Sequence, residues 1–212
     1  MIDELAPFLS RTYLLLLALL LVSRGMDVLS TWVATPNLVL EGNPIAKKLG
    51  WRWGLPLNIG LSMLLAFWAL PAIVISTTSV LVAARNFQSA WLMRSLGEHV
   101  YRDWHVERIQ ETRITLYLFC LAANTLLTAG VGAAVVYFSK QALVPFAIGA
   151  GIIAYAAAVL FYTLLAILRM RRKAGLEIRL NQRRIVADSL KVGANGQLST
   201  LGVADVPQFE GK

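Results

Sequence analysis

Residues 11–35 read RTYLLLLALLLVSRGMDVLSTWVAT, and this stretch decides the class of fold. Its first part, residues 13–22, is an unbroken apolar run. A helix needs roughly 20 predominantly apolar residues to cross the hydrocarbon core of a bilayer. The stretch ends before Pro36, and a residue that precedes proline is pushed away from helical geometry. The sequence therefore predicts a transmembrane helix over residues 11–35.

Three more apolar segments follow, over residues 51–84, 114–138 and 143–168. Of the 212 residues, 57% are apolar and only 15% are charged, which is more apolar surface than a water-soluble domain of this length can bury. Pro56 suits the entrance of the second segment, and Pro71 predicts a kink within it. We expect an all-α membrane protein, built as a four-transmembrane-helix bundle.

Between the second and third spans, apolar and aromatic side chains recur at helical spacing within an otherwise polar segment. This pattern is typical of an amphipathic helix that lies along the membrane interface, here over residues 87–111. The transmembrane domain is then expected to cover residues 1–173, followed by a basic, partly disordered cytoplasmic tail over residues 174–212.

The distribution of basic residues predicts the orientation. Residues 85–113 carry five arginines, whereas the opposite side holds Lys47, Lys48, Arg52 and Lys140. Because cytoplasmic loops are enriched in lysine and arginine, we expect a multi-pass protein of the plasma (cytoplasmic or inner) membrane with both termini inside, N-in and C-in. The loop that contains Glu41 then faces outward.

The net charge of +8 also bears on partners. Basic residues at 169, 171, 172 and 173 directly follow the last span, where anionic lipid headgroups attract them. We therefore expect membrane lipids as partners, with anionic headgroups at the basic tail, and we expect no nucleic acid.

Ionisable and amide side chains interrupt the first two apolar spans, and others lie in the loop between them. Ionisable groups within a span cost roughly 2.5–3.5 kcal/mol each on insertion scales, so they are candidates for a functional site. Two carboxylates with nearby hydroxyl and amide oxygens can hold a hard cation or a cationic headgroup. We expect a binding cluster near the outer leaflet, formed by Arg24, Asp27, Thr31, Glu41, Asn43 and Asn58.

Two structural alternatives stay open for these residues. Arg24 and Asp27 lie three positions apart and can pair with each other, or extend to the interface. The segment from Glu41 to Pro44 has turn-forming residues and can be a solvated surface turn whose side chains satisfy its own backbone.

The order Asp27, Ser30-Thr31 and then Glu41-x-Asn43-Pro44 resembles a family of small prokaryotic integral membrane proteins classed as a domain of unknown function. The shared pattern is an Asp and a Thr late in the first helix, followed by Glu-x-Asn-Pro before the second. The resemblance covers about residues 12–80. It implies that these residues act as a unit, and it implies no mechanism.

Other motifs carry less weight. His99 and His105 lie among acidic residues, yet no HExxH or HxxxH spacing supports a metal site, so we expect no metal and no cofactor. Asn124 and nearby hydroxyl and small residues suit helix packing, either within the hairpin of the last two spans or between protomers. The sequence also lacks the phosphate-binding glycine loop and the GxSxG motif of common enzymes.

These observations favour a non-enzymatic binding or assembly module whose polar cluster recognises a lipid headgroup, a cation or a partner. One alternative is a small oligomeric transporter, with Arg24, Asp27 and Asn124 along its path. Another is a membrane-embedded lipid-modifying enzyme in which Asp27 or Glu41 is the general base. A homo-oligomer or a membrane-protein partner is compatible with each.

Overall fold

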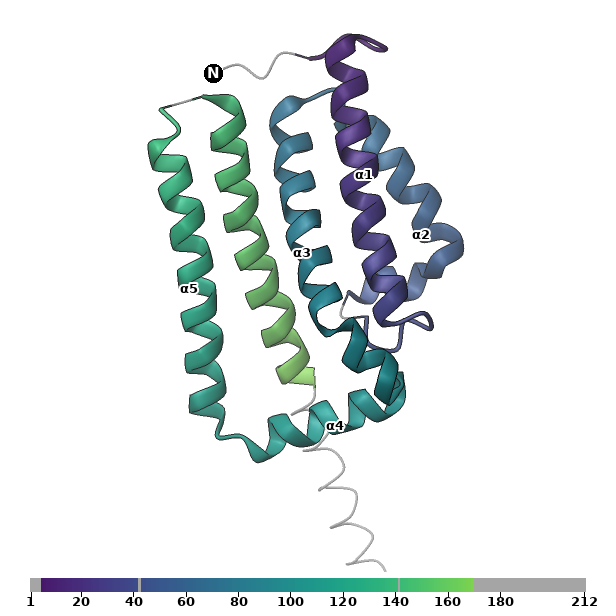
Figure 1. Cartoon of the computed structure of the whole chain (residues 1–212), viewed down its shortest axis with the longest axis vertical. Helices are drawn as coiled ribbons and strands as arrows, with labels where there is room; N and C mark the ends of the chain where they lie inside the picture. The colour runs from purple at the N-terminus through teal and green to yellow at the C-terminus, as the bar shows by residue number, and fades with distance from the viewer. Residues whose placement is uncertain (1–4, 42, 141, 170–212) are drawn as a thin grey trace, which may run out of the picture. The chain divides into compact units, whose positions relative to one another are not determined.

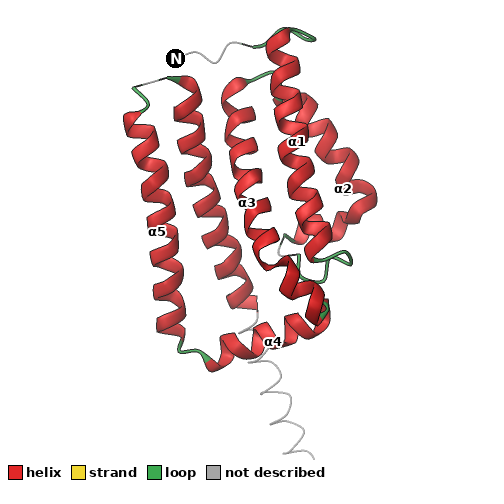
Figure 2. Ribbon diagram, in the orientation of Figure 1, coloured by secondary structure: helices red, strands yellow, loops and turns green. Residues whose placement is uncertain are grey.

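The computed structural model describes residues 5–41, 43–140 and 142–169, and the regular secondary structure of these residues is helical throughout (Figure 2). Four helices are long and apolar enough to cross a membrane: Arg11–Ala34, Ala69–Leu96, Ile114–Phe138 and Leu143–Arg169. The prediction of an all-α membrane bundle is confirmed.

The chain divides into two compact units, Met1–Ala166 and Ile167–Lys212. The predicted tail, residues 174–212, and the basic residues at 171–173 lie outside the described residues.

The first helix, α1 (Arg11–Ala34), begins where Ser10 caps it by accepting a hydrogen bond from the backbone N–H of Tyr13. Its buried side chains, Tyr13, Leu16, Leu20 and Ser23 among them, recur every three or four residues and form one stripe. The Tyr13 hydroxyl donates to the carbonyl of Met63 at 3.1 Å. The apolar end of α1 is thus fixed against the end of the next helix.

The expected single span over residues 51–84 is wrong. The chain instead forms α2 (Pro44–Leu65), turns at residues 66–68, and continues as α3 (Ala69–Leu96). Trp68 is extended (φ −123°, ψ 122°), and Pro71 lies in the first turn of α3, where a helix tolerates proline because the backbone donors there have no intrahelical partner. Pro71 therefore helps to begin a helix and does not kink one.

The turn between α2 and α3 brings the chain back to the start of α1. The carbonyl of Phe67 accepts a hydrogen bond from the backbone N–H of Ala6 at 2.9 Å. Figure 1 shows α1 and α3 running in the same direction, with α2 returning between their ends. Because Lys47, Lys48 and Arg52 dilute its hydropathy, α2 is not among the four helices long and apolar enough to span.

The expected interfacial helix over residues 87–111 is also wrong in its first part. Residues 87–96 belong to α3, and α4 covers only Glu98–Glu111. The break falls at Gly97, whose φ of 81° is readily available to glycine and uncommon for other residues. Figure 1 shows α4 lying across the ends of the longer helices before α5 (Ile114–Phe138) begins.

The extra passage through α2 changes which loops share an end of the bundle. The Glu98 carboxylate accepts hydrogen bonds from Thr35 and Asn37, so the loop after α1 lies at the α4 end. The expectation that the Glu41 loop and residues 85–113 lie on opposite sides is therefore wrong.

Close packing without bulky side chains joins the other helices. The helix Leu143–Arg169 approaches α3 at Gly151, where an added Cβ would lie 2.8 Å from the carbonyl oxygen of Val74. It approaches α5 where Gly132 faces Gly149, and a Cβ on Gly132 would lie 2.8 Å from the Gly149 carbonyl oxygen. Glycine at these positions lets the helix backbones come close, as in many membrane proteins.

Candidate functional site

The guanidinium group of Arg24 joins three helices. On α1 it forms an ion pair with Asp27, with 3.0 Å between Nη1 and Oδ2. Its Nε donates to the Asn58 side-chain oxygen on α2 at 3.0 Å, and Nη2 donates to the same oxygen. Nη1 also donates to the Ser79 hydroxyl on α3 at 3.2 Å. We call Arg24, Asp27, Asn58 and Ser79 the polar joint.

Local structure positions each member of the polar joint. Arg24 and Asp27 lie three residues apart and so share a face of α1. The Asn58 amide nitrogen donates to the carbonyl of Gly54 at 2.8 Å, which turns its oxygen toward Arg24. Ser79 is 2% exposed, on the surface of α3 that α1 covers. The geometry of the joint is therefore fixed by backbone as well as by side chains.

The polar joint lies well inside the span. Arg24 is about 20 Å along the axis from the start of α1, a helix about 36 Å long. The side chains of Arg24 and Asp27 are 28% and 19% exposed, so they are largely enclosed by helices. Pairing opposite charges reduces the cost of holding either one in hydrocarbon.

A second polar contact lies one to two turns further along α1. The Asn86 amide on α3 donates to the hydroxyl oxygens of Thr31 at 3.2 Å and Ser30 at 3.3 Å. The Ser30 hydroxyl in turn donates to the carbonyl of Asp27 at 2.8 Å. Hydroxyl and amide groups thus line the contact of α1 with α3 from the polar joint toward the α4 end.

Glu41 and Asn43 organise the loop that leads into α2. The Glu41 carboxylate accepts a hydrogen bond from the backbone N–H of Asn43 at 2.8 Å, and the Asn43 side chain caps α2 by accepting from the N–H of Ile45. Glu41 lies within electrostatic range of Asp27. Among the described residues, no side chain bonds to both of these carboxylates.

The structure therefore divides the six residues proposed from sequence into three groups. Arg24, Asp27 and Asn58 are bonded together, and Thr31 belongs to the adjacent contact with Asn86. Glu41 and Asn43 satisfy their own loop, as the alternative of a structural turn predicts. Asn124 is exposed on α5, whereas the polar joint lies among α1, α2 and α3, so within the described residues of one subunit no contact joins Asn124 to Arg24 or Asp27.

Sequence reasoning missed Ser79, Asn86 and Glu98. The first two are polar interruptions of α3. The run Ser76-Thr77-Thr78-Ser79 is a signal that could have revealed Ser79, but Asn86 lies outside it. Their alignment with Arg24 and Thr31 required α1 and α3 to run in parallel. That arrangement depends on the turn at residues 66–68, which the hydropathy pattern hides.

Glu98 connects the loop after α1 to the start of α4. Its carboxylate accepts from the Thr35 hydroxyl at 2.7 Å, from the backbone N–H and side-chain amide of Asn37, both at 3.0 Å, and from the N–H of Val39 at 3.1 Å. Burial alone would raise the pKa of Glu98, but these hydrogen bonds together hold its pKa below its usual value.

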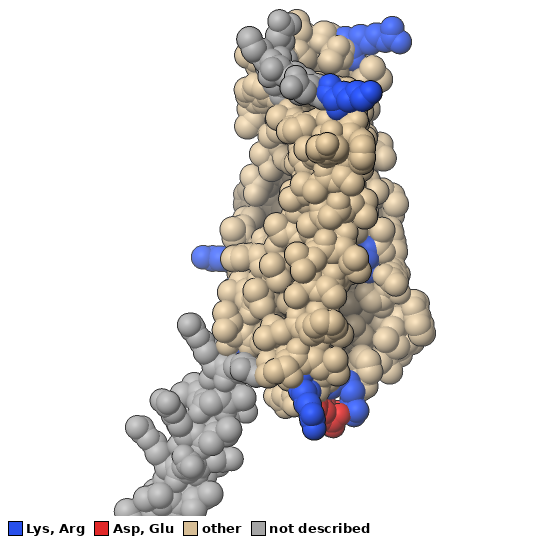
Figure 3. All heavy atoms as spheres, turned by 90° about the vertical axis from the view of Figure 1, so that its left-hand side faces the viewer, with Lys and Arg blue, Asp and Glu red and all other residues tan. Residues whose placement is uncertain are grey.

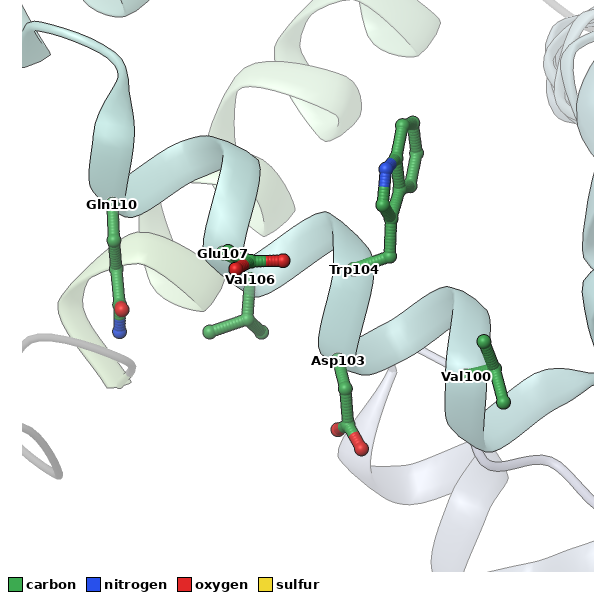
Figure 4. Close-up of a pocket in the computed structure, with 6 residues that line it drawn as sticks. All are labelled: Val100, Asp103, Trp104, Val106, Glu107 and Gln110. Carbon is green, nitrogen blue, oxygen red and sulfur yellow. The ribbon is translucent and has the colours of Figure 1, made fainter.

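A shallow hollow of about 690 Å³ lies along α4 (Figure 4). Its lining residues, Val100, Asp103, Trp104, Val106, Glu107 and Gln110, all belong to α4, so no second element closes it within the described part of the chain. His105 stacks on Tyr101, and burial lowers the pKa of His105. No group of three or more His, Cys, Asp or Glu side chains suited to a metal occurs among residues 5–41, 43–140 and 142–169.

Comparisons with protein-family models, with curated proteins and with solved structures find no match to this chain. The resemblance to the family with the Glu-x-Asn-Pro loop therefore stays a prediction.

The Glu98 contacts predict a pH-dependent stability. A carboxyl with a depressed pKa stabilises the fold fully above the pKa of an unfolded glutamate, about 4.3, and this contribution is lost as pH falls through the folded pKa. Glu98→Gln leaves donors facing an amide nitrogen and should cost about 1–3 kcal/mol near neutral pH. Thermal unfolding in detergent from pH 7 to pH 3 should show the difference between wild type and variant shrinking toward acid. A pH-independent difference would contradict this role.

Proposed function

We propose that this protein is a non-enzymatic membrane module that binds a cationic group between the polar joint and the Glu41 loop. The observation that carries the proposal is an unequal use of hydrogen-bonding atoms. Arg24 directs its donors to Asp27, Asn58 and Ser79, whereas Oδ1 of Asp27 accepts no hydrogen bond from any described residue. The joint thus has acceptor capacity left over after Arg24 is satisfied.

Glu41 extends this acceptor capacity toward the end of the bundle. Its Oε1 caps the loop, while Oε2 has no hydrogen-bond partner among the residues described. A primary ammonium group has three N–H donors, so it suits a path lined by free carboxylate oxygens. Since the described residues offer no cluster of three metal-ligating side chains, an organic cation suits these two carboxylates better than a fully coordinated divalent ion.

The same chemistry can come from two sources, an aminolipid headgroup or a lysine of a partner membrane protein. The positions of the two carboxylates favour a cationic group that enters from the α4 end. Asp27 is about 10 Å from that end of α1, and Glu41 lies beyond it. The pairing of Asp27 with Arg24 supports a binding role over that of a general base, which must reach a substrate proton.

We also propose that the α4 end faces the cytoplasm of a plasma (inner) membrane. Basic side chains are concentrated at this end: Lys47, Lys48, Arg94, Arg102, Arg108 and Arg113. The start of α1 and the turn after α5 contribute Arg11 and Lys140. The positive-inside rule then puts the start of α1 outside, which revises the N-in orientation expected from sequence, and puts the cationic site in the inner leaflet.

Native mass spectrometry of gently extracted protein tests the binding function. The wild type should retain a phospholipid with a primary amine, or a basic partner subunit, and Asp27→Asn/Glu41→Gln should lose it. The control is Asp103→Asn/Glu107→Gln, which removes two exposed carboxylates from α4. Reloading the delipidated protein with phosphatidylethanolamine and phosphatidylcholine separates the chemistries, because the trimethylated headgroup has no N–H donor. Equal retention by wild type and Asp27→Asn/Glu41→Gln would refute the proposal.

Thiol labelling of intact cells tests the orientation. In a Cys120→Ser background, Ala142→Cys should react with a membrane-impermeant maleimide, and Ser95→Cys should react only after the cells are opened. The reverse pattern would put the α4 end outside.

A further inference from the structure

Asn124 lies near the middle of α5, about 15 Å along the axis from the start of the helix. Its side chain is exposed, and its amide forms no hydrogen bond with any described residue. Only its backbone carbonyl is engaged, as the acceptor for the Thr128 hydroxyl at 2.8 Å. An asparagine side chain is too short to reach the interface from this depth.

In hydrocarbon, an amide without partners loses the hydrogen bonds it would make with water, a cost of several kcal/mol on scales where nothing can compensate. In the polar joint, by contrast, Arg24, Asn58 and Ser79 are bonded to one another across helices. Asn124 therefore calls for a partner other than the described residues of its own chain.

The helix α5 has room for such a partner. In the most apolar 18-residue stretch of α5, only 6% is buried. The corresponding share is 22% in each of the other three helices long enough to span a membrane. Its close contact is with Leu143–Arg169, at Gly132 and Gly149. Figure 3 views the α5 side of Figure 1, and the long middle band of that face is uncharged apart from basic atoms at its two margins.

We infer that α5 forms an interface with α5 of a second copy of this chain, with Asn124 bonded to Asn124 of the partner subunit. A carboxamide carries both donors and an acceptor, so two copies related by a twofold axis satisfy each other. The residues on the same face, Cys120, Leu127 and Val131, follow spacings of four and three residues, and all are exposed. Leu127 and Val131, 73% and 59% exposed, supply apolar contact beside the amide.

The single cysteine provides a direct test, because Cys120 lies one turn before Asn124 on the same face. Oxidation of native membranes with copper phenanthroline should cross-link the wild type into a dimer of the chain's own mass. Asn124→Leu should weaken association about three- to tenfold, and Asn124→Gln, which keeps the amide, should weaken it less. Because the Asn124 side chain is exposed and bonds to no described residue, neither substitution removes a side-chain hydrogen bond within the described part of the subunit.

Two further measurements keep the result independent of the thiol. In Phe119→Cys/Cys120→Ser the cysteine moves about 100° around α5, and dimer cross-linking should fall sharply. Native mass spectrometry of Cys120→Ser should still show a dimer that Asn124→Leu dissociates. Cross-linking that is equal at positions 119 and 120, a cross-linked product that contains another protein, or a dimer unaffected by Asn124→Leu would each overturn the inference.

Discussion

A guanidinium group inside a membrane must be surrounded by acceptors, and this constraint on Arg24 shapes the first half of the bundle. One partner, Asp27, comes from the same helix, and the others come from α2 and α3. To supply Asn58 and Ser79 together, the chain must return through α2 and run α3 parallel to α1. The turn at residues 66–68 and the extended Trp68 make that path possible. The proposed cationic site is what remains of the acceptors once Arg24 is satisfied.

Sequence alone predicted the parts of the structure that hydropathy encodes. The apolar runs identified α1, α5 and the last helix closely, because lipid requires a continuous apolar segment of sufficient length. The same rule merged α2 with α3, since a short turn of Ala66, Phe67 and Trp68 is itself apolar. The predicted interfacial helix begins too early in the chain, because periodicity alone does not reveal that α3 continues to Leu96.

The sequence predicts those members of the candidate site whose residue types are unusual within a membrane span. Arg24 and Asp27 stand out within an apolar run, and their pairing was one of two readings that spacing allowed. Ser79 and Asn86 are ordinary residues in a membrane helix and gain meaning only from the register of α1 against α3. Glu98 looked like part of a polar segment, and its hydrogen bonds to Thr35 and Asn37 depend on a chain reversal that no local pattern predicts.

A double-mutant cycle on Arg24 and Asp27 tests most directly whether the polar joint holds the helices together. Arg24→Gln and Asp27→Asn should each lower the free energy of unfolding in detergent by about 2–4 kcal/mol, since each leaves a largely buried charge without its partner. The double variant should cost less than the sum, with a coupling of about 1–3 kcal/mol. The exposed pair Arg102 and Asp103 is the matched control and should couple by less than about 1 kcal/mol. Additive effects at Arg24 and Asp27 would contradict the joint as the interaction on which this fold depends.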